Sequence, residues 1–386
     1  MEATQQEATV ATPAKTVAAI DVGSNALRMV VAEVLPEGHT EVLERFHRAV
    51  RLGQDTFQRG RLGGQSMRAA VGILRDFRHR LELYKVERLR AVATSAVREA
   101  SNADNFLNRV FMATGLNVEV IATSEESRLT VSAVRQAMGD ALSVNRGHAL
   151  IAEAGGGSTL LTILEEGEIA ASQSLRLGSI RLQETLSTAE EGPERSADLL
   201  RHHIDNAMAT TRSVLPLERI QSFVAVGGDA RFAGRQVGRP IGSADLYVVS
   251  AAGLDKLVRR CSLHSPEELG KKYGLPFSEA ETLVPALLVY QCLLHSTRAK
   301  RMIVSHVSMR DGLLLELAHY VRGEEDTALV TSVIHSAESL AEKYRVDLVH
   351  ARNVAETAVR LFDELQPDHG LGARHRLLLR VAGLLH

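Results

Sequence analysis

Residues 152–160 read AEAGGGSTL, with a short apolar run on either side, HALI at 148–151 and LLTIL at 160–164. Apolar runs of this length that are bounded by glycine are typical of β-strands. Glycine inside a strand pattern weakens a sheet, so three consecutive glycines predict a turn in which the backbone approaches a ligand closely. A carboxylate, Glu153, stands two residues before the turn.

The same plan occurs near the N-terminus. A predicted strand from Thr16 to Ile20 leads into DVGSN at 21–25, and a second strand follows from Ala26 to Val34. Here Asp21 stands two residues before Gly23. Two hairpins with an acidic residue before a glycine turn indicate a duplicated domain.

Hydrophobic periodicity predicts the elements between and after these hairpins. We expect a strand at 41–51 ending in Leu52-Gly53, and a loop at 94–98. Pro285 lies inside an apolar helical segment, so a kink or break is expected there. Helices are expected at 67–81, 103–113, 124–138, 190–214, 278–296, 309–320 and from residue 327 onward.

Composition limits the class of protein. A chain of 386 residues exceeds one core, so two or three domains are expected. The formal charge of −2 means that any polyanion must be held by local arginines, and neither a nucleic-acid nor a membrane partner is predicted.

Residues 1–15 lack the pattern of a signal peptide and are predicted to form a disordered tail. Cys261 and Cys292 have no metal or redox spacing, which indicates a reduced, cytoplasmic setting.

Glycine turns suit a phosphate chain, because their backbone N–H groups form an anion-binding nest that no side chain obstructs. Carboxylates beside such a nest would repel phosphate, so Asp21 and Glu153 are predicted to hold a divalent cation. Oxygen ligands with several waters suit Mg²⁺. The alternative is that both segments are ordinary tight hairpins.

Seven segments resemble a known family in order and spacing. They are AAIDVGSNALRMVVAEV, AVATSAVREASNADNFL, IATSEESRLTVSAV, GGGSTL, SLRLGSIRL, VGGDARFAG and VSMRDGLLLEL. Together they resemble the exopolyphosphatase and guanosine pentaphosphate phosphohydrolase (Ppx/GppA) family over about residues 17–322. The resemblance implies an α/β, actin-like (ribonuclease H-like), duplicated two-lobed fold. It implies domain I at 16–139 with a returning segment at 309–322, and domain II at 140–308.

The resemblance also implies a function and site residues. Members hydrolyse terminal phosphoanhydride bonds of inorganic polyphosphate or guanosine pentaphosphate, and the sequence does not choose between these substrates. Arg98 would be a catalytic, phosphate-facing arginine. The other phosphate-binding residues implied are Gly23, Ser24, Asn25, Arg28, Gly155, Gly156, Gly157, Ser158, Gly227, Gly228 and Arg310. A homodimer is left open.

Glu126 matches the family's candidate catalytic glutamate, which would deprotonate the attacking water. The segment Thr123-Ser124-Glu125-Glu126 also reads as a capping box, in which Glu126 only bonds the start of a helix. Glu125 and Arg128 are expected to lie on a solvated helix face.

Three residues depart from the family's pattern. Glu153 replaces an aspartate, Leu160 replaces a glutamate, and Asp229 stands where a hydroxyl is usual. Leu160 and Asp229 keep open a catalytically degenerate member that binds a polyanion or nucleotide as a sensor. Separately, the implied fold leaves an ATP-dependent phosphotransferase as a further alternative, against which Asp229 argues.

Residues 325–386 resemble the start of the helical HD-type domain of longer members. His350 and His386 stand at positions like those of metal ligands. HD chemistry needs an aspartate after the second histidine, so a short, incomplete all-α segment is expected, with His350 in a structural role.

Overall fold

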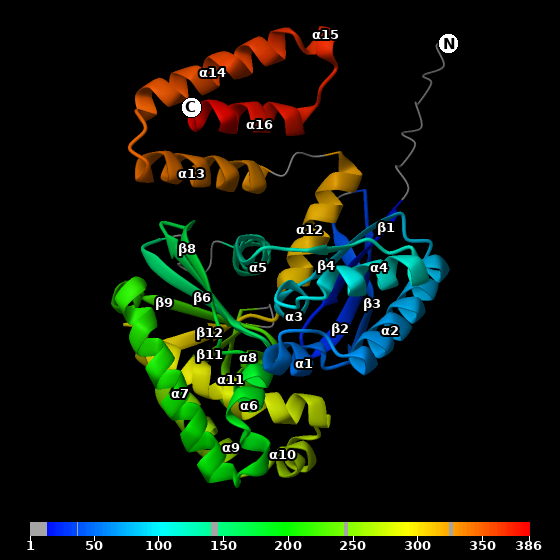
Figure 1. Cartoon of the computed structure of the whole chain (residues 1–386). Coiled ribbons are helices and arrows are strands. Elements are labelled where there is room, and N and C mark those ends of the chain that lie inside the picture. The colour runs from blue at the N-terminus through cyan, green and yellow to red at the C-terminus, as the bar shows by residue number, and fades with distance from the viewer. Residues whose placement is uncertain (1–13, 37, 140–145, 243–245, 324–326) are drawn as a thin grey trace, which may run out of the picture.

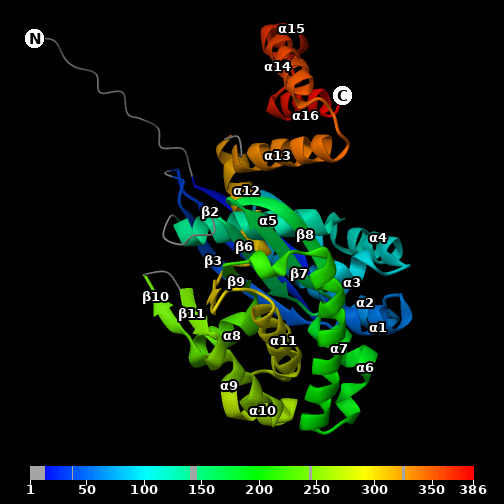
Figure 2. The ribbon, with the colours of Figure 1, turned by 90° about the vertical axis from the view of Figure 1, so that its left-hand side faces the viewer.

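The computed structural model describes residues 14–386 except 37, 140–145, 243–245 and 324–326. Most of the N-terminal segment that the sequence predicts to be disordered, residues 1–13, therefore lies outside the described residues. Two lobes, each built on one sheet, lie side by side, and four C-terminal helices stand above them (Figures 1 and 2).

The first lobe contains a five-stranded sheet in the order β3-β2-β1-β4-β5. The first three strands pair antiparallel, and β4 and β5 continue parallel to β1. Strand β1 is apolar along almost its whole length because helices cover both faces of the sheet. The strands are β1 (Lys15–Val22), β2 (Ala26–Val34), β3 (Thr40–Ala49), β4 (Arg88–Ala93) and β5 (Val118–Val120).

The second lobe repeats this arrangement. Its strands β8-β7-β6-β9-β12 have the same order and directions, and β11 and β10 extend the edge antiparallel. The fold is thus the duplicated actin-like fold that the sequence predicts. These strands are β6 (His148–Ala154), β7 (Thr159–Glu165), β8 (Glu168–Leu175), β9 (Ser222–Val226), β10 (Arg239–Ile241), β11 (Leu246–Ser250) and β12 (Arg301–Val304).

Helix α5 (Thr123–Met138) lies between the lobes (Figure 1). Its Leu129 joins the core over the first sheet, and Val134 joins a core on the second sheet. Helix α12 (Met309–Arg322) packs beside it on the first sheet. A Cβ on Gly312 would lie 2.1 Å from the Leu129 carbonyl oxygen, so glycine lets the two helices touch there. Helices α2 (Gly64–Leu83) and α4 (Ala103–Thr114) cover the opposite face.

The prediction for residues 50–53 and 94–98 was wrong. Strand β3 ends at Ala49, and helix α1 (Leu52–Arg59) begins where the strand was expected to end. The chain turns because the amides of Val50 and Arg51 both donate to the Asn25 carbonyl of the first hairpin. Residues 95–98 form a helical turn, α3 (Ser95–Arg98), rather than a loop.

Helix α11 (Phe277–His295) is not broken at Pro285. Proline removes the N–H that would bond the Glu281 carbonyl. The Gln183 side chain donates to that carbonyl at 2.6 Å instead. The other helices of this lobe are α6 (Ser179–Leu186), α7 (Pro193–Val214), α8 (Gly228–Val237), α9 (Ala251–Ser262) and α10 (Pro266–Tyr273).

The C-terminal helices have a small core of their own, formed by Ala337, Ala355 and Leu384. The rings of His350 and His386 lie 6.4 Å apart between centroids. Within the described residues, no three His, Cys, Asp or Glu side chains are grouped as a metal ion would require. No helix in the same residues is long and apolar enough to cross a bilayer. The helices are α13 (Thr327–Lys343), α14 (Leu348–Glu364), α15 (Gln366–His369) and α16 (Ala373–Leu384).

Candidate functional site

A cavity of about 440 Å³ lies between the two lobes. The turn of each glycine hairpin, the β9–α8 turn and the first turns of α5 and α12 all reach it. It collects every site residue expected from the sequence except Arg98: Asp21, Gly23, Ser24, Asn25, Arg28, Glu126, Glu153, Gly155, Gly156, Gly157, Ser158, Gly227, Gly228 and Arg310.

The two hairpins place their acidic residues at equivalent positions. Asp21 lies opposite Arg28 in the β1–β2 register, and Glu153 lies opposite Leu160 in the β6–β7 register. Each acid is two residues before the first glycine of its turn. The duplication therefore gives the first carboxylate a cation across the strand pair, whereas the second carboxylate faces an apolar neighbour.

Asp21 is surrounded by positive charge. The Arg310 Nη1 atom donates to Asp21 Oδ2 at 2.8 Å, and Arg28 Nη1 lies 3.8 Å from the same oxygen. Arg310 is held in the first turn of α12 by a capping box in which Ser308 and Asp311 bond each other. Burial and the neighbouring Arg310 lower the pKa of Arg28. Arg310, expected to face phosphate, thus binds a carboxylate while lining the cavity.

The first glycine turn is held by side-chain bonds. Ser24 and Ser95 share a hydrogen bond of 2.9 Å between their Oγ atoms, and Asn25 Nδ2 donates to the Ser278 carbonyl of the second lobe at 2.9 Å. The amide of Gly23 donates to the Ala26 carbonyl and closes the turn. The turn therefore contacts both lobes.

The second glycine turn has free amides. Gly155 N–H donates to the Ser158 carbonyl at 2.9 Å, but within the described part of the chain the amides of Gly156, Gly157 and Ser158 bond no other group. All three residues line the cavity, and unpaired amides of a glycine turn can bind an anion. Gly157 has a further reason to be glycine, since a Cβ there would lie 2.3 Å from Ser95 Oγ.

Glu126 projects from the first turn of α5 and is buried. The Arg98 Nη1 atom donates to Glu126 Oε1 at 3.1 Å and to the Ile121 carbonyl at 2.8 Å. Burial raises the pKa of Glu126 to about 7, against the opposing charge of Arg98. The alternative interpretation of residues 123–126 as a capping box is wrong, because α5 begins after Ala122 and no side chain caps it.

Two further carboxylates line the cavity with raised pKa values. Burial, followed by repulsion from Asp21, raises the pKa of Glu153. Burial raises the pKa of Asp229 to about 7, and Thr282 Oγ1 donates to its Oδ1 at 3.4 Å. The positive charges of Arg28 and Arg231 oppose this shift. Asp229 therefore lies among cations that offset its repulsion of a phosphate.

Sequence reasoning missed several cavity residues. Arg231 and Arg235 lie one turn apart on α8, directly after the glycine turn that precedes it. Arg231 follows Gly227 by four residues, and Arg235 follows Arg231 by four, so both lie on one helix face. This spacing was a signal in the sequence that could have identified them. Arg45 and His47 come from β3, and their approach depends on the sheet and is not visible in sequence.

Two family models match the chain. The model described as the Ppx/GppA phosphatase family matches residues 30–321, and the model described as Ppx/GppA phosphatase, domain III, matches residues 334–386. Curated relatives include a guanosine-5'-triphosphate,3'-diphosphate pyrophosphatase of Aliivibrio fischeri (strain MJ11), 24% identical over 96% of this chain and 71% of the relative. Exopolyphosphatase 1 of Mycobacterium leprae is 28% identical over 77% of this chain and 87% of the relative.

Solved structures have the same fold. An exopolyphosphatase from Cytophaga hutchinsonii matches with a TM-score of 0.71 and 22% identity, over 81% of this chain and 99% of that one. The Ppx/GppA family member from Aquifex aeolicus matches with a TM-score of 0.64 and 23% identity, over 80% of this chain and 99% of that one.

Proposed function

The chain belongs to the Ppx/GppA phosphatase family, and from that premise we propose that it hydrolyses terminal phosphoanhydride bonds of inorganic polyphosphate or guanosine pentaphosphate. The names of its curated relatives support both substrates. The observation that carries the proposal is that both glycine turns and Glu126 border one cavity.

In the proposed complex the terminal phosphate lies at the second glycine turn. The free amides of Gly156, Gly157 and Ser158 bind its oxygens. Arg28 and Arg231 add positive charge from opposite lobes. Fixed donors of this kind stabilise charge in the transition state without having to reorganise.

Glu126 acts as the general base. Its carboxylate accepts a proton from water as the water oxygen bonds the terminal phosphorus, and the bridging oxygen leaves with the shortened chain. A pKa of about 7 suits this role, because the base is then part ionised at neutral pH. Arg98 keeps the accepting carboxylate oriented through its 3.1 Å hydrogen bond.

The residues present fit a hydrated Mg²⁺ ion. Asp21 and Glu153 line the same cavity, and after burial the repulsion from Asp21 helps to raise the pKa of both Glu126 and Glu153. Mg²⁺ typically takes one or two carboxylates and keeps several waters. We assign Asp21 and Glu153 to hold it, and when bound it supplies charge that neutralises the transferring phosphoryl group.

Phosphate release tests the proposal. Purified protein with Mg²⁺ is given long-chain polyphosphate and, separately, guanosine pentaphosphate. We expect release from at least one substrate, and a loss of about 10²- to 10⁴-fold in Glu126→Gln. Glu82→Gln is the matched control, because the Glu82 side chain is 58% exposed and pairs with Arg78 on the same helix, α2. Wild-type release no greater than that of Glu126→Gln would refute the proposal.

Binding without turnover is the second candidate, and Leu160 favours it. This apolar side chain lines the cavity opposite Glu153, where the family has an acid. Thermal stabilisation by either substrate without phosphate release would support a sensor.

A further inference from the structure

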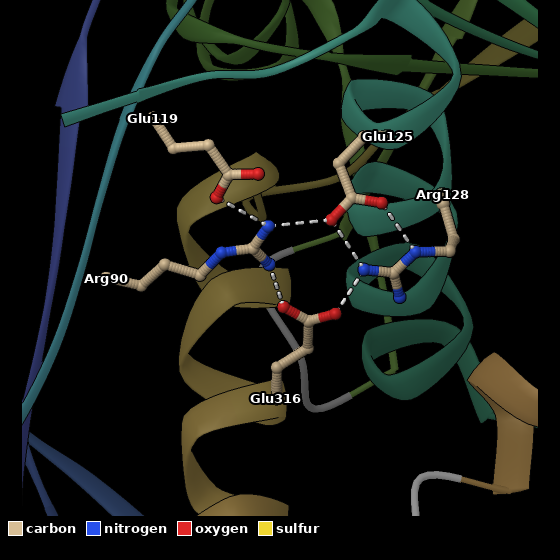
Figure 3. Close-up of polar contacts among 5 residues, drawn as sticks. All are labelled: Arg90, Glu119, Glu125, Arg128 and Glu316. Atoms are coloured by element: carbon tan, nitrogen blue, oxygen red, sulfur yellow. Dashed lines mark hydrogen bonds and ion pairs between the residues drawn. The ribbon is translucent and has the colours of Figure 1, made fainter. Parts of the chain in front are cut away.

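Five charged side chains form a network between α5, α12 and the edge of the first sheet (Figure 3). Arg90 Nη2 donates to Glu125 Oε1 at 3.0 Å, and Arg128 Nε donates to Glu125 Oε2 at 2.9 Å. Glu316 accepts from both Arg90 and Arg128. These four residues close a ring of alternating charge, which we call the ion-pair ring, and Glu119 joins it from β5 through Arg90 at 3.3 Å.

The ion-pair ring is partly shielded from solvent, and its most exposed side chains, Arg90 and Glu125, are 25% and 26% exposed. The side chain of Arg128 is 11% exposed and that of Glu316 is 18% exposed. Each carboxylate of the ring bonds both arginines, so removing one member takes one partner away from each of two others. Loss of one partner from a buried network costs far more than loss of an exposed pair.

The ion-pair ring joins the two helices that carry cavity residues. Glu125 precedes Glu126 in the first turn of α5. Glu316 lies in the middle of α12, the helix that presents Arg310 to Asp21 in its first turn. The two helices also touch at Gly312, so the ring and this contact together fix their relative placement.

We propose that Glu316 is a positioning residue, which fixes the first turn of α5 against α12 by bonding Arg90 and Arg128 and so places the Glu126 carboxylate for reaction. It is the member that α12 contributes to the ring. The inference rests on the proposed function, because it assigns Glu316 a part in the same reaction.

A double-mutant cycle on the full chain tests this role. Glu316→Gln keeps the size of the side chain but removes its charge. We expect kcat to fall about 10- to 100-fold, as for a displaced catalytic group, while KM changes less than about twofold. In the Glu126→Gln background the same change should lower kcat by less than about twofold, because its effect acts through Glu126. Glu82→Gln again serves as control.

Hydrogen exchange gives a readout that does not depend on turnover. Glu316→Gln should speed exchange of the amides of residues 122–129 at least about tenfold, and Glu82→Gln should leave them unchanged. If Glu316→Gln does not fold, Glu316→Asp retains the charge but is too short to bond both arginines, and the same two results are expected.

The outcomes separate the two proposals. An active wild type with unchanged kcat in Glu316→Gln, or with equal losses in both backgrounds, overturns the positioning role alone. An inactive wild type refutes the proposed function, and exchange at 122–129 then decides whether the ring holds α5. Unchanged exchange overturns the inference in either case.

Discussion

Arg98 Nη1 lies 3.1 Å from Glu126 Oε1, although the two residues come from different elements, α3 and α5. The same nitrogen donates to the Ile121 carbonyl just before α5. Arg98 does not line the cavity. Its contact with the proposed base therefore differs from the phosphate contact that the sequence predicts.

Replacing Arg98 should shift the pH dependence of the reaction. Burial raises the pKa of Glu126 to about 7, and Arg98 opposes that rise. The base form exists above this pKa, so kcat/KM should increase through about pH 7 in the wild type. In Arg98→Met this rise in kcat/KM should move to a pH about one to two units higher, because a hydrogen bond to a charged group is worth about 1.5–3 kcal/mol.

A pH–rate profile measures this shift. Arg109→Met, at an exposed position of α4, is the matched control, and its kcat/KM should rise at the same pH as in the wild type. If Arg98→Met lowers kcat/KM at every pH but leaves the rise near pH 7 in place, the assignment of that rise to Glu126 is contradicted.

Gly157→Ala should push the second glycine turn away from Ser24 and Ser95 of the first lobe. The new Cβ would lie 2.3 Å from Ser95 Oγ and 2.6 Å from Ser24 Oγ. We expect a loss of about 1–3 kcal/mol in unfolding free energy from overpacking, and a fall in kcat of at least about tenfold. Denaturant unfolding and phosphate release measure the two effects. At Gly72, in the interior of α2, a Cβ meets nothing within 4 Å, so Gly72→Ala should be neutral or stabilising.

The hairpins and their acid-glycine turns could be predicted because their signal is local. A strand, a glycine turn and a second strand lie within about twenty residues and occur twice. The repetition also gave the duplicated fold. The helix at 124–138 followed from its periodicity in the same way, and the structure has α5 at Thr123–Met138.

The surroundings of Glu126 could not be predicted, because they depend on distant segments. Glu125 and Arg128 were expected on a solvated face, and this was wrong. They bind Arg90 from β4 and Glu316 from α12, which are 35 and 188 residues away from them. Spacing within one helix does not show which face a second helix will cover.

Asp229→Asn should stabilise the protein at alkaline pH. Burial raises the pKa of Asp229 to about 7, above its usual 3.8, so the folded state binds more protons than the unfolded state between these values. Stability from this group is fully present below about pH 4 and is lost as pH rises to about 7.

In Asp229→Asn the side chain carries no charge at any of these pH values, so the substitution removes the cost of burying a charged carboxylate. At pH 8 we expect the midpoint of thermal unfolding to rise by about 2–4 °C, which corresponds to about 1 kcal/mol of unfolding free energy. At pH 4 we expect no increase. Thermal unfolding at both pH values measures it. An equal change at pH 4 and pH 8 would show that proton binding is not the cause.

Tyr290→Phe should disturb both turns of the second lobe at once. The buried Tyr290 hydroxyl accepts from the Ala154 amide at 2.9 Å and donates to the Val226 carbonyl at 2.6 Å. These two backbone groups adjoin the second glycine turn and the turn before α8. Loss of one oxygen leaves both unpaired, which costs about 1–3 kcal/mol.

Denaturant unfolding measures that loss, and phosphate release should fall because the free amides of the glycine turn lose their support. Tyr320→Phe is the control, since Tyr320 is 62% exposed on α12. Full stability with reduced turnover in Tyr290→Phe would mean that water replaces the hydroxyl in bonding both groups, with the turn displaced. Full stability together with full turnover would show that β6 and β9 fix the two turns without Tyr290.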